Sequence, residues 1–394
     1  MTAGEILLVH AGPPWQTNGG SVFLDQFAEL AGRPCAHLVV SLEGQPMDVP
    51  AAFGRSVVQV TAREGVRGMG VLERRSRWGA RHLYWGAVYP RALAHHTRAA
   101  VAAVRATRPV HAVVVLNALE VPVVAAALLR ELRIPYSTME WDLLDEAIQG
   151  LGLAQPLERR ERARVAGLRA GAVTRGVASE GMVDYYRATW SLDSVVLRQV
   201  ATQERRSTTR NTGLVIAVCG NVYTPAEFRA LLAALDRLGW SIGGRPVTVD
   251  VIGQIAADVG PLPPQVSVSG WVTYDESLAR LAGADIGYCP YWFDPARAAL
   301  VATSFPSKLI SYLTCGVPVF YHGPATGTPA AFLARYPAGI GCHSLDAATV
   351  ADALVRFAGS PDRLDLARQA AERAVCEELS ADTLRSRIAS LIGQ

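Results

Sequence analysis

Residues 303–320 read TSFPSKLISYLTCGVPVF and predict a helix followed by a turn and a strand. Apolar residues recur at helical spacing. Pro306 suits the first turn because it has no N–H to leave unpaired, and Gly316 suits the position just past the helix end. The flanking runs DIGYCPYW and VPVFYHG are continuously apolar, which is typical of parallel strands covered on both faces. The stretch therefore predicts a strand, a helix and a strand of a parallel α/β sheet.

The same alternation of apolar strand and amphipathic helix occupies most of the chain. In the first half it is seen in EILLVHAG, GGSVFLDQFAELAG, HAVVVLNA, EVPVVAAALLRELR and IPYSTMEW. It restarts in the second half with GLVIAVCGN, PAEFRALLAALDRLG, VTVDVIGQ, VSVSGWV and YDESLARLAGA. Between the two sets, ATQERRSTTRNTG is polar and without periodicity, which indicates a linker.

The two sets predict an α/β fold of two Rossmann-like α/β/α domains that face a central cleft. We expect an N-terminal domain over residues 1–200, a linker at 201–212 and a C-terminal domain at 213–376. Residues 377–394 predict a terminal helix that packs back on the N-terminal domain. Ligands of such sheets bind beyond the carboxyl ends of the strands, so a functional site is expected there.

The composition indicates a folded cytoplasmic protein. Half of the 394 residues are hydrophobic and 19% are charged, which excludes a disordered chain. The formal net charge of +3 gives no reason to expect nucleic-acid binding. The six cysteines form no C-x-x-C pair and are expected to be buried thiols. No basic leader precedes the first strand, and no apolar run approaches the roughly 18–20 residues that span a bilayer, so we expect neither a signal peptide nor a membrane span.

Lys308 is the one lysine among 38 basic residues, and all the others are arginine. It falls on the opening turn of the predicted helix, where free backbone N–H groups and the helix dipole favour an anion. A lysine ammonium is a compact, mobile point charge that can follow a phosphate, whereas the planar guanidinium needs a different geometry. We interpret Lys308 and Ser307 as a phosphate site. The alternative is a lysine on a solvated helix.

The segment FPSKLISYLTCGVPVF resembles the P-S-K-L-x-E-Y-x-x-x-G-x-P-V signature of retaining glycosyltransferases of the GT-B fold, of the family-four type. The segments ILLVHAGPPWQTNGGS, GAVTRGVASEGMVDYY and VSVSGWVTYDESLARLAGADIGYCP are similar to that family in the same order. The resemblance implies transfer of a hexosyl or deoxysugar group from a nucleoside-diphosphate sugar to an acceptor, with retention and with no metal or other cofactor. The sequence contains no D-x-D triplet, the usual set of metal ligands at a sugar-nucleotide diphosphate.

The resemblance also implies which residues hold the donor. Lys308 would be the catalytic cation that neutralises the leaving diphosphate, together with Ser307. Gly19 and Gly20 would let the backbone approach the diphosphate, unless they form only an ordinary strand-to-helix turn. The other donor-binding candidates are Gly220, Asn221, Trp271, Val272, Thr303, Ser304 and Ser311.

Four positions depart from the family pattern. Thr303 and Ser311 stand where the family has glutamates, and Asn221 and Ala226 stand where it has an arginine and a lysine. The second glutamate of the family holds the ribose hydroxyls, and a serine can make one such bond but not two, which favours a deoxynucleotide donor such as dTDP. The losses leave two alternatives open, a non-catalytic GT-B partner of another transferase and a sugar-nucleotide epimerase, although epimerase chemistry needs carboxylates in the cleft.

Two acidic residues are the catalytic candidates on the acceptor side. Glu140 and Asp142 follow the IPYSTM run, where the family has a histidine or an acid near the acceptor, and Glu140 occupies the position of the histidine. Either carboxylate would act on the acceptor hydroxyl or amine. The alternative is a helix start that is enriched in acids because of the helix dipole.

Residues 63–91, REGVRGMGVLERRSRWGARHLYWGAVYPR, interleave arginines with aromatic and aliphatic residues. One hypothesis is that this segment docks on an anionic membrane surface bearing a lipid-linked acceptor, as a peripheral contact at the inner face of the membrane. A second is that the arginines hold a soluble, acidic small-molecule acceptor. A third is that the aromatic side chains pack on the core while the arginines stay in water.

Overall fold

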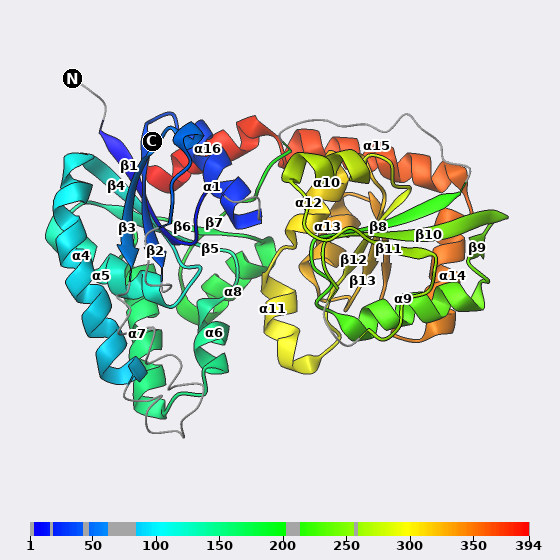
Figure 1. The fold of residues 1–394 in the computed structure, drawn as a ribbon, viewed down its shortest axis with the longest axis horizontal. Coiled ribbons are helices and arrows are strands. Elements are labelled where there is room, and N and C mark those ends of the chain that lie inside the picture. The colour runs from blue at the N-terminus through cyan, green and yellow to red at the C-terminus, as the bar shows by residue number, and fades with distance from the viewer. Residues whose placement is uncertain are drawn as a thin grey trace. The chain divides into compact units, whose positions relative to one another are not determined.

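The computed structural model describes residues 4–15, 19–41, 47–61, 84–201, 213–255 and 259–393. The chain divides into two compact units, one formed by Met1–Arg198 with Arg385–Gln394 and the other by Gln199–Leu384. Each unit is built around one mainly parallel sheet with helices packed on it (Figure 1). The predicted fold class, two Rossmann-like α/β domains, is confirmed. Apart from Ala201, the predicted linker lies outside the described residues.

The sheet of the first unit has seven parallel strands in the order β3-β2-β1-β4-β5-β6-β7. The strands are β1 (Glu5–Ala11), β2 (Cys35–Ser41), β3 (Ser56–Thr61), β4 (Pro109–Val115), β5 (Tyr136–Glu140), β6 (Arg175–Val177) and β7 (Val195–Val196). The helices are α1 (Gly19–Leu30), η1 (Ala51–Phe53), η2 (Tyr84–Val88), α4 (Tyr89–Ala106), α5 (Glu120–Leu132), α6 (Leu144–Gly150), α7 (Gln155–Gly171) and α8 (Glu180–Trp190).

The sheet of the second unit has the order β11-β10-β8-β12-β13-β14, with β9 antiparallel to β10 at one end. The strands are β8 (Leu214–Cys219), β9 (Ser241–Ile242), β10 (Arg245–Ile252), β11 (Val266–Val268), β12 (Ile286–Pro290), β13 (Val319–His322) and β14 (Gly339–Cys342). The helices are α9 (Pro225–Arg237), α10 (Tyr274–Leu281), η3 (Pro295–Arg297), α11 (Ala298–Thr303), α12 (Ser307–Thr314), α13 (Thr328–Arg335), α14 (Ala347–Ala358) and α15 (Pro361–Glu378).

The last helix, α16 (Ala381–Ile392), begins in the second unit and ends in the first. Within the first unit, the hydroxyl of Ser137 on β5 donates a 2.6 Å hydrogen bond to the carbonyl of Leu391. The end of the chain is therefore tied to the sheet of the first unit.

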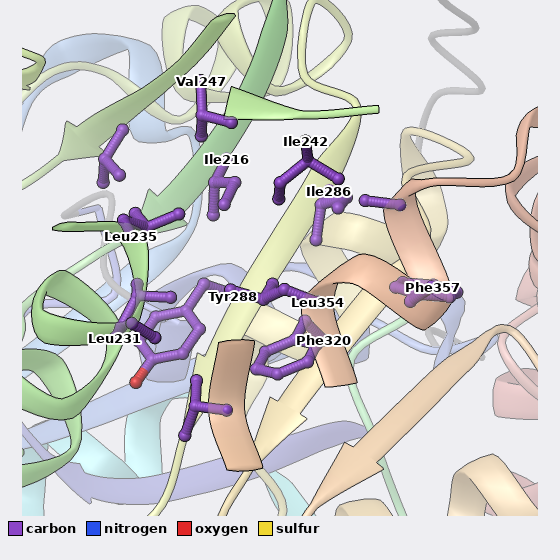
Figure 2. Close-up of a cluster of buried hydrophobic side chains, with 14 of the residues drawn as sticks. Ile216, Leu231, Leu235, Ile242, Val247, Ile286, Tyr288, Phe320, Leu354 and Phe357 are labelled. Carbon is purple, nitrogen blue, oxygen red and sulfur yellow. The ribbon is translucent and has the colours of Figure 1, made fainter. Parts of the chain in front are cut away.

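Both faces of the second sheet are buried, as its continuous apolar strands require. Figure 2 shows the cluster on one face, where Ile216 and Tyr288 lie among Leu231 and Leu235 of α9 and Leu354 of α14. Side chains that alternate with these along the strands form a second cluster with α10, α12 and α15. Helix α12 is consequently enclosed between the sheet and α15.

Among the described residues, three fully buried histidines make the stability of the fold sensitive to pH. His10, His37 and His322 are fully inaccessible to solvent. Burial lowers the pKa of His10 to about 4, of His37 to about 3 and of His322 to about 4, because the imidazolium form loses its hydration. Each ring has a neutral partner: His10 and His37 share a 3.0 Å hydrogen bond, and His322 bonds the hydroxyl of Tyr288 at 2.7 Å.

We predict that the free energy of unfolding falls as the pH is lowered from 7.5 to 5.5. The unfolded chain, with histidine pKa values near 6.5, binds protons in this window that the folded chain does not, so each buried histidine contributes a slope of up to roughly 1 kcal/mol per pH unit. Urea unfolding at several pH values measures the slope. His322→Asn should reduce it, whereas His95→Asn, at an exposed position, should not. A stability that is constant over this range would contradict the prediction.

Candidate functional site

The strand order of the second sheet reverses between β8 and β12. The chain starts at the central strand β8, adds β10 and β11 on one side and then returns to add β12, β13 and β14 on the other. The loops after β8 and β12 therefore run in opposite directions, and ligands of such sheets bind at this topological switch point. The C-terminal candidates gather at the carboxyl edge of this sheet: Gly220 and Asn221 after β8, Trp271 and Val272 after β11, and Thr303, Ser304, Ser307, Lys308 and Ser311 between β12 and the body of α12.

Lys308 is buried within this site, with an exposed fraction of only 7%. Its ammonium donates a 3.3 Å hydrogen bond to the carbonyl of Asn221, so α12 is linked to the loop after β8. Burial lowers the pKa of the ammonium from its usual range, although the thiols of Cys289 and Cys219 act in the opposite direction. In the part of the chain that the structure describes, no carboxylate lies within ion-pair distance of this ammonium. The alternative of a solvated lysine is thus wrong.

Helix α12 begins as the sequence predicts. Pro306 is its N-cap residue. The N–H groups of Ser307 and Lys308 lie in the first turn, where backbone N–H groups have no acceptor within the helix. Beyond the other end, Gly316 has φ +65° and donates to the carbonyl of Leu313 at 2.9 Å. At the carboxyl edge of the sheet the helix therefore presents the positive end of its dipole and the N–H groups of Ser307 and Lys308, for which the described residues offer no acceptor.

Two glycines allow the loops after β8 and β10 to meet closely. Gly220 has φ +76°, and its N–H donates to the carbonyl of Ile252 at 2.8 Å. Gly253 has φ +151°, and a Cβ atom there would lie 2.3 Å from the carbonyl oxygen of Gly220. Substitution of Gly253 would therefore separate the loop after β10 from the loop after β8, which carries Asn221.

The hydroxyl groups near α12 bond mainly within their own helices. Thr303 donates to the carbonyl of Ala299 at 2.7 Å, and Ser311 donates to the carbonyl of Ser307 at 3.4 Å. Ser304 donates to the carbonyl of Leu300 at 2.7 Å. At the positions that lack the family glutamates, the side chains thus have local bonding partners inside the helices.

Two aromatic residues of the site are not among the sequence candidates. Tyr223 follows β8 and Trp292 follows β12, and their rings stack with centroids 4.8 Å apart at an angle of 22°. The ammonium of Lys308 lies 4.7 Å from the centroid of the Tyr223 ring. Neither residue belongs to a motif, and the only sequence signal is that each follows the end of a strand.

The candidates Gly19, Gly20, Glu140 and Asp142 belong to the first unit. Gly19 and Gly20 begin α1, directly after the loop that leaves β1. Asp142 is exposed in the loop between β5 and α6. Gly19, Gly20 and Asp142 therefore lie beyond the carboxyl ends of β1 and β5, and Glu140 is the last residue of β5.

Glu140 is a fully buried member of an ion-pair cluster. It ends β5, and its carboxylate accepts hydrogen bonds of 2.6 and 3.0 Å from Arg169, which is only 1% exposed. Tyr186 donates a short hydrogen bond to the same carboxylate, and the N–H of Leu144 donates at 2.7 Å. Asp145 of α6 pairs with Arg169 at 2.6 Å. These contacts give Glu140 the role of joining β5, α7 and α8, and they leave no reason to assign it proton transfer.

Most of the arginine-rich segment 63–91 lies outside the described residues, which resume at residue 84. In the described end, the rings of Trp85 and Tyr89 have centroids 4.7 Å apart and pack against the core of the first unit. Arg160 of α7 donates to the carbonyls of Trp85 and Gly86 at 2.9 and 2.8 Å. This end is thus held by the protein itself. Over the described residues, no helix combines the length and the apolar character that a bilayer crossing requires.

The chain is similar over its whole length to solved glycosyltransferase structures. HepE of Anabaena, solved in complex with UDP and glucose, has a TM-score of 0.67 at 13% identity, over 99% of this chain and 100% of that chain. Sucrose-phosphate synthase of Thermosynechococcus elongatus has a TM-score of 0.62 at 12% identity, over 99% and 95% of the two chains. WaaG, a glycosyltransferase of lipopolysaccharide biosynthesis, has a TM-score of 0.60 at 14% identity, over 99% and 100%.

The chain has the GT-B fold. No protein-family model matches the sequence, and neither does any curated protein. At identities of 12–14% the structural likeness establishes the fold, and chemical function has to be argued from the residues of the site.

We predict that Glu140→Gln destabilises the protein by about 3–5 kcal/mol, because it leaves the buried guanidinium of Arg169 without its main partner. Thermal or urea unfolding measures the loss. Glu131→Gln is a matched control, since the side chain of Glu131 is 51% exposed and should contribute little. An unchanged stability with a lost activity would instead assign Glu140 to the chemistry.

Proposed function

We propose that this protein is a glycosyltransferase that transfers a sugar from a nucleoside-diphosphate sugar to an acceptor hydroxyl or amine, with retention of the anomeric configuration. The observation that carries the proposal is the buried ammonium of Lys308 at the switch point of the second sheet. The GT-B fold supports it by analogy, because that fold is the architecture of the solved glycosyltransferases that the chain resembles.

A buried cation without an anionic partner is costly for a folded protein. Removing an ammonium from water costs several kcal/mol, and Lys308 recovers part of this through a carbonyl and an aromatic ring. The sequence uses arginine at every other basic position, so retention of a lysine here indicates a specific requirement. Among the residues that the structure describes, no carboxylate pairs with this ammonium, and a ligand with negative charge would supply that partner.

The geometry suits a leaving diphosphate. The N–H groups of the first turn of α12 and the ammonium of Lys308 lie on one helix start, and both favour negative charge. As the bond between the sugar and the diphosphate breaks, charge grows on the leaving phosphate oxygen. An ammonium that is already desolvated stabilises this charge more than it stabilises the bound donor, which is the condition for faster reaction.

The acceptor side of the proposal rests on fewer residues. With Glu140 engaged by Arg169 and Tyr186, Asp142 is the remaining acidic candidate in the first unit. We propose that the first unit receives the acceptor, whether this is a small molecule or a lipid-linked sugar. Asp142→Asn would then lower turnover more than donor binding.

A second function, a non-catalytic GT-B partner of another transferase, is favoured by one observation. Thr303 and Ser311, at the positions of the family glutamates, direct their hydroxyls to backbone carbonyls of their own helices. A degenerate partner should bind no nucleoside diphosphate well. Calorimetry with UDP, GDP and dTDP separates the two proposals, because a transferase should bind at least one of them.

We predict that Lys308→Met lowers affinity for the preferred nucleoside diphosphate and slows donor turnover by about thirtyfold to a thousandfold, equivalent to a loss of about 2–4 kcal/mol of transition-state stabilisation. Lys308→Arg should restore part of the rate. The melting temperature of Lys308→Met should be equal to or above that of the wild type, because a buried charge is removed. Calorimetry, donor hydrolysis and thermal unfolding measure these quantities.

The matched control for this variant is Arg237→Ala. It removes an exposed cation from the C-terminal end of α9, whereas the loop that contacts Lys308 precedes the N-terminal end of that helix. It should change neither nucleotide affinity nor rate. If Lys308→Met binds and turns over donor as the wild type does, Lys308 has no part in diphosphate binding and the proposal fails.

We predict that dTDP binds at least as tightly as UDP, because Ser311 cannot provide the bidentate grip on a ribose diol that a glutamate provides. A ribonucleotide deprived of that partner loses about 1–3 kcal/mol, or roughly tenfold to a hundredfold in affinity. Competition between dTDP, UDP and GDP measures the preference. Ser311→Glu should shift it toward the ribonucleotides. Tighter binding of UDP or GDP than of dTDP to the wild type would contradict the prediction.

A further inference from the structure

The aromatic pair at the switch point holds the charged group of the site. Tyr223 leaves β8 and Trp292 leaves β12, the two strands between which the strand order reverses. Their stacking, 4.8 Å between centroids at 22°, bridges two loops that are 69 positions apart in the sequence. Arg297 lies 5.7 Å from the ring of Trp292, so a cation accompanies each ring of the pair.

Over the described residues, the hydrogen bond and the ring contact of the Lys308 ammonium come from a single short loop. The backbone carbonyl oxygen of Asn221 lies 3.3 Å from the ammonium nitrogen, and the centroid of the Tyr223 ring lies 4.7 Å from it. Neither group carries a formal negative charge. The two contacts therefore fix the position of the ammonium without neutralising it, whereas a carboxylate would form an ion pair that a phosphate has to displace.

The loop that carries Trp292 is itself held by a buried acid. Glu227, with an exposed fraction of 3%, lies on α9 just after Tyr223, and its carboxylate accepts a 2.8 Å hydrogen bond from the N–H of Phe293. The hydroxyl of Tyr288 donates to the backbone carbonyl of Glu227 at 2.9 Å. Tyr223 lies just before the start of α9, and an acid of α9 bonds the loop that carries Trp292, so the loops of both rings are joined to one helix.

We propose that Tyr223, backed by Trp292, is a positioning residue that holds the Lys308 ammonium for an anionic ligand. The ligand class is a diphosphate, so the inference rests on the proposed function. A lysine side chain has four rotatable bonds, and the ring limits the volume that its charged end explores while leaving the charge available. Tyr223 does this through its π face, so a phenyl ring should serve as well as a phenol.

The test compares the affinity of inorganic pyrophosphate and UDP for the full-length wild type, Tyr223→Phe, Tyr223→Leu, Trp292→Leu and Trp240→Leu. Tyr223→Leu should bind both ligands about tenfold more weakly or worse, and Tyr223→Phe should stay within about twofold of the wild type. Trp292→Leu should show an intermediate loss. Trp240→Leu, an aromatic control whose backbone carbonyl accepts from Val247 near the start of β10, should bind normally.

A double-mutant cycle distinguishes positioning from general damage to the fold. If Tyr223 acts through Lys308, then adding Tyr223→Leu to Lys308→Met should cause no further loss of affinity. An equal loss in both backgrounds, or a failure of Tyr223→Phe to rescue binding, overturns the positioning role. If Lys308→Met alone leaves pyrophosphate affinity unchanged, the proposed function fails first. If it lowers affinity while Tyr223→Leu does not, only the role of Tyr223 fails.

Discussion

The ammonium of Lys308 is the feature on which the site depends. It is buried at the start of α12, and its contacts in the described structure are a backbone carbonyl and an aromatic ring. Such an arrangement does not maximise stability, because a methionine would fill the same space without the cost of desolvation. The surrounding elements nevertheless make it possible: the sheet and α15 enclose α12, and Gly220 and Gly253 let the loops after β8 and β10 approach each other closely.

Much of this could be predicted from sequence because the signals are local. Apolar runs and turn residues identify β8, β12 and α12, and Pro306 and Gly316 mark both ends of that helix. The rule that ligands bind at carboxyl ends of parallel strands then brings Lys308 to the edge where it lies. Short or weakly apolar strands such as β7 and β14 were not predictable in this way, because pairing with neighbouring strands determines them.

Interactions between distant residues could not be predicted. Nothing in the sequence links Tyr223 to Trp292, or Glu140 to Arg169, because each pair is assembled by the sheet. Arg169 of α7 is charged and yet buried, because a residue is placed by its contacts as well as by its polarity. For the same reason Glu140, a candidate base by position, belongs to an ion-pair cluster.

The single lysine permits a direct measurement of diphosphate binding at this helix. Protein labelled with ¹⁵N at lysine alone gives one backbone amide signal, that of Lys308 in the first turn of α12. Titration with UDP, dTDP and inorganic pyrophosphate should shift this signal at saturation, whereas uridine and thymidine, which lack the phosphates, should not. A signal that stays in place at saturating nucleoside diphosphate, or moves equally with the nucleosides, would show that the diphosphate does not bind at the start of α12.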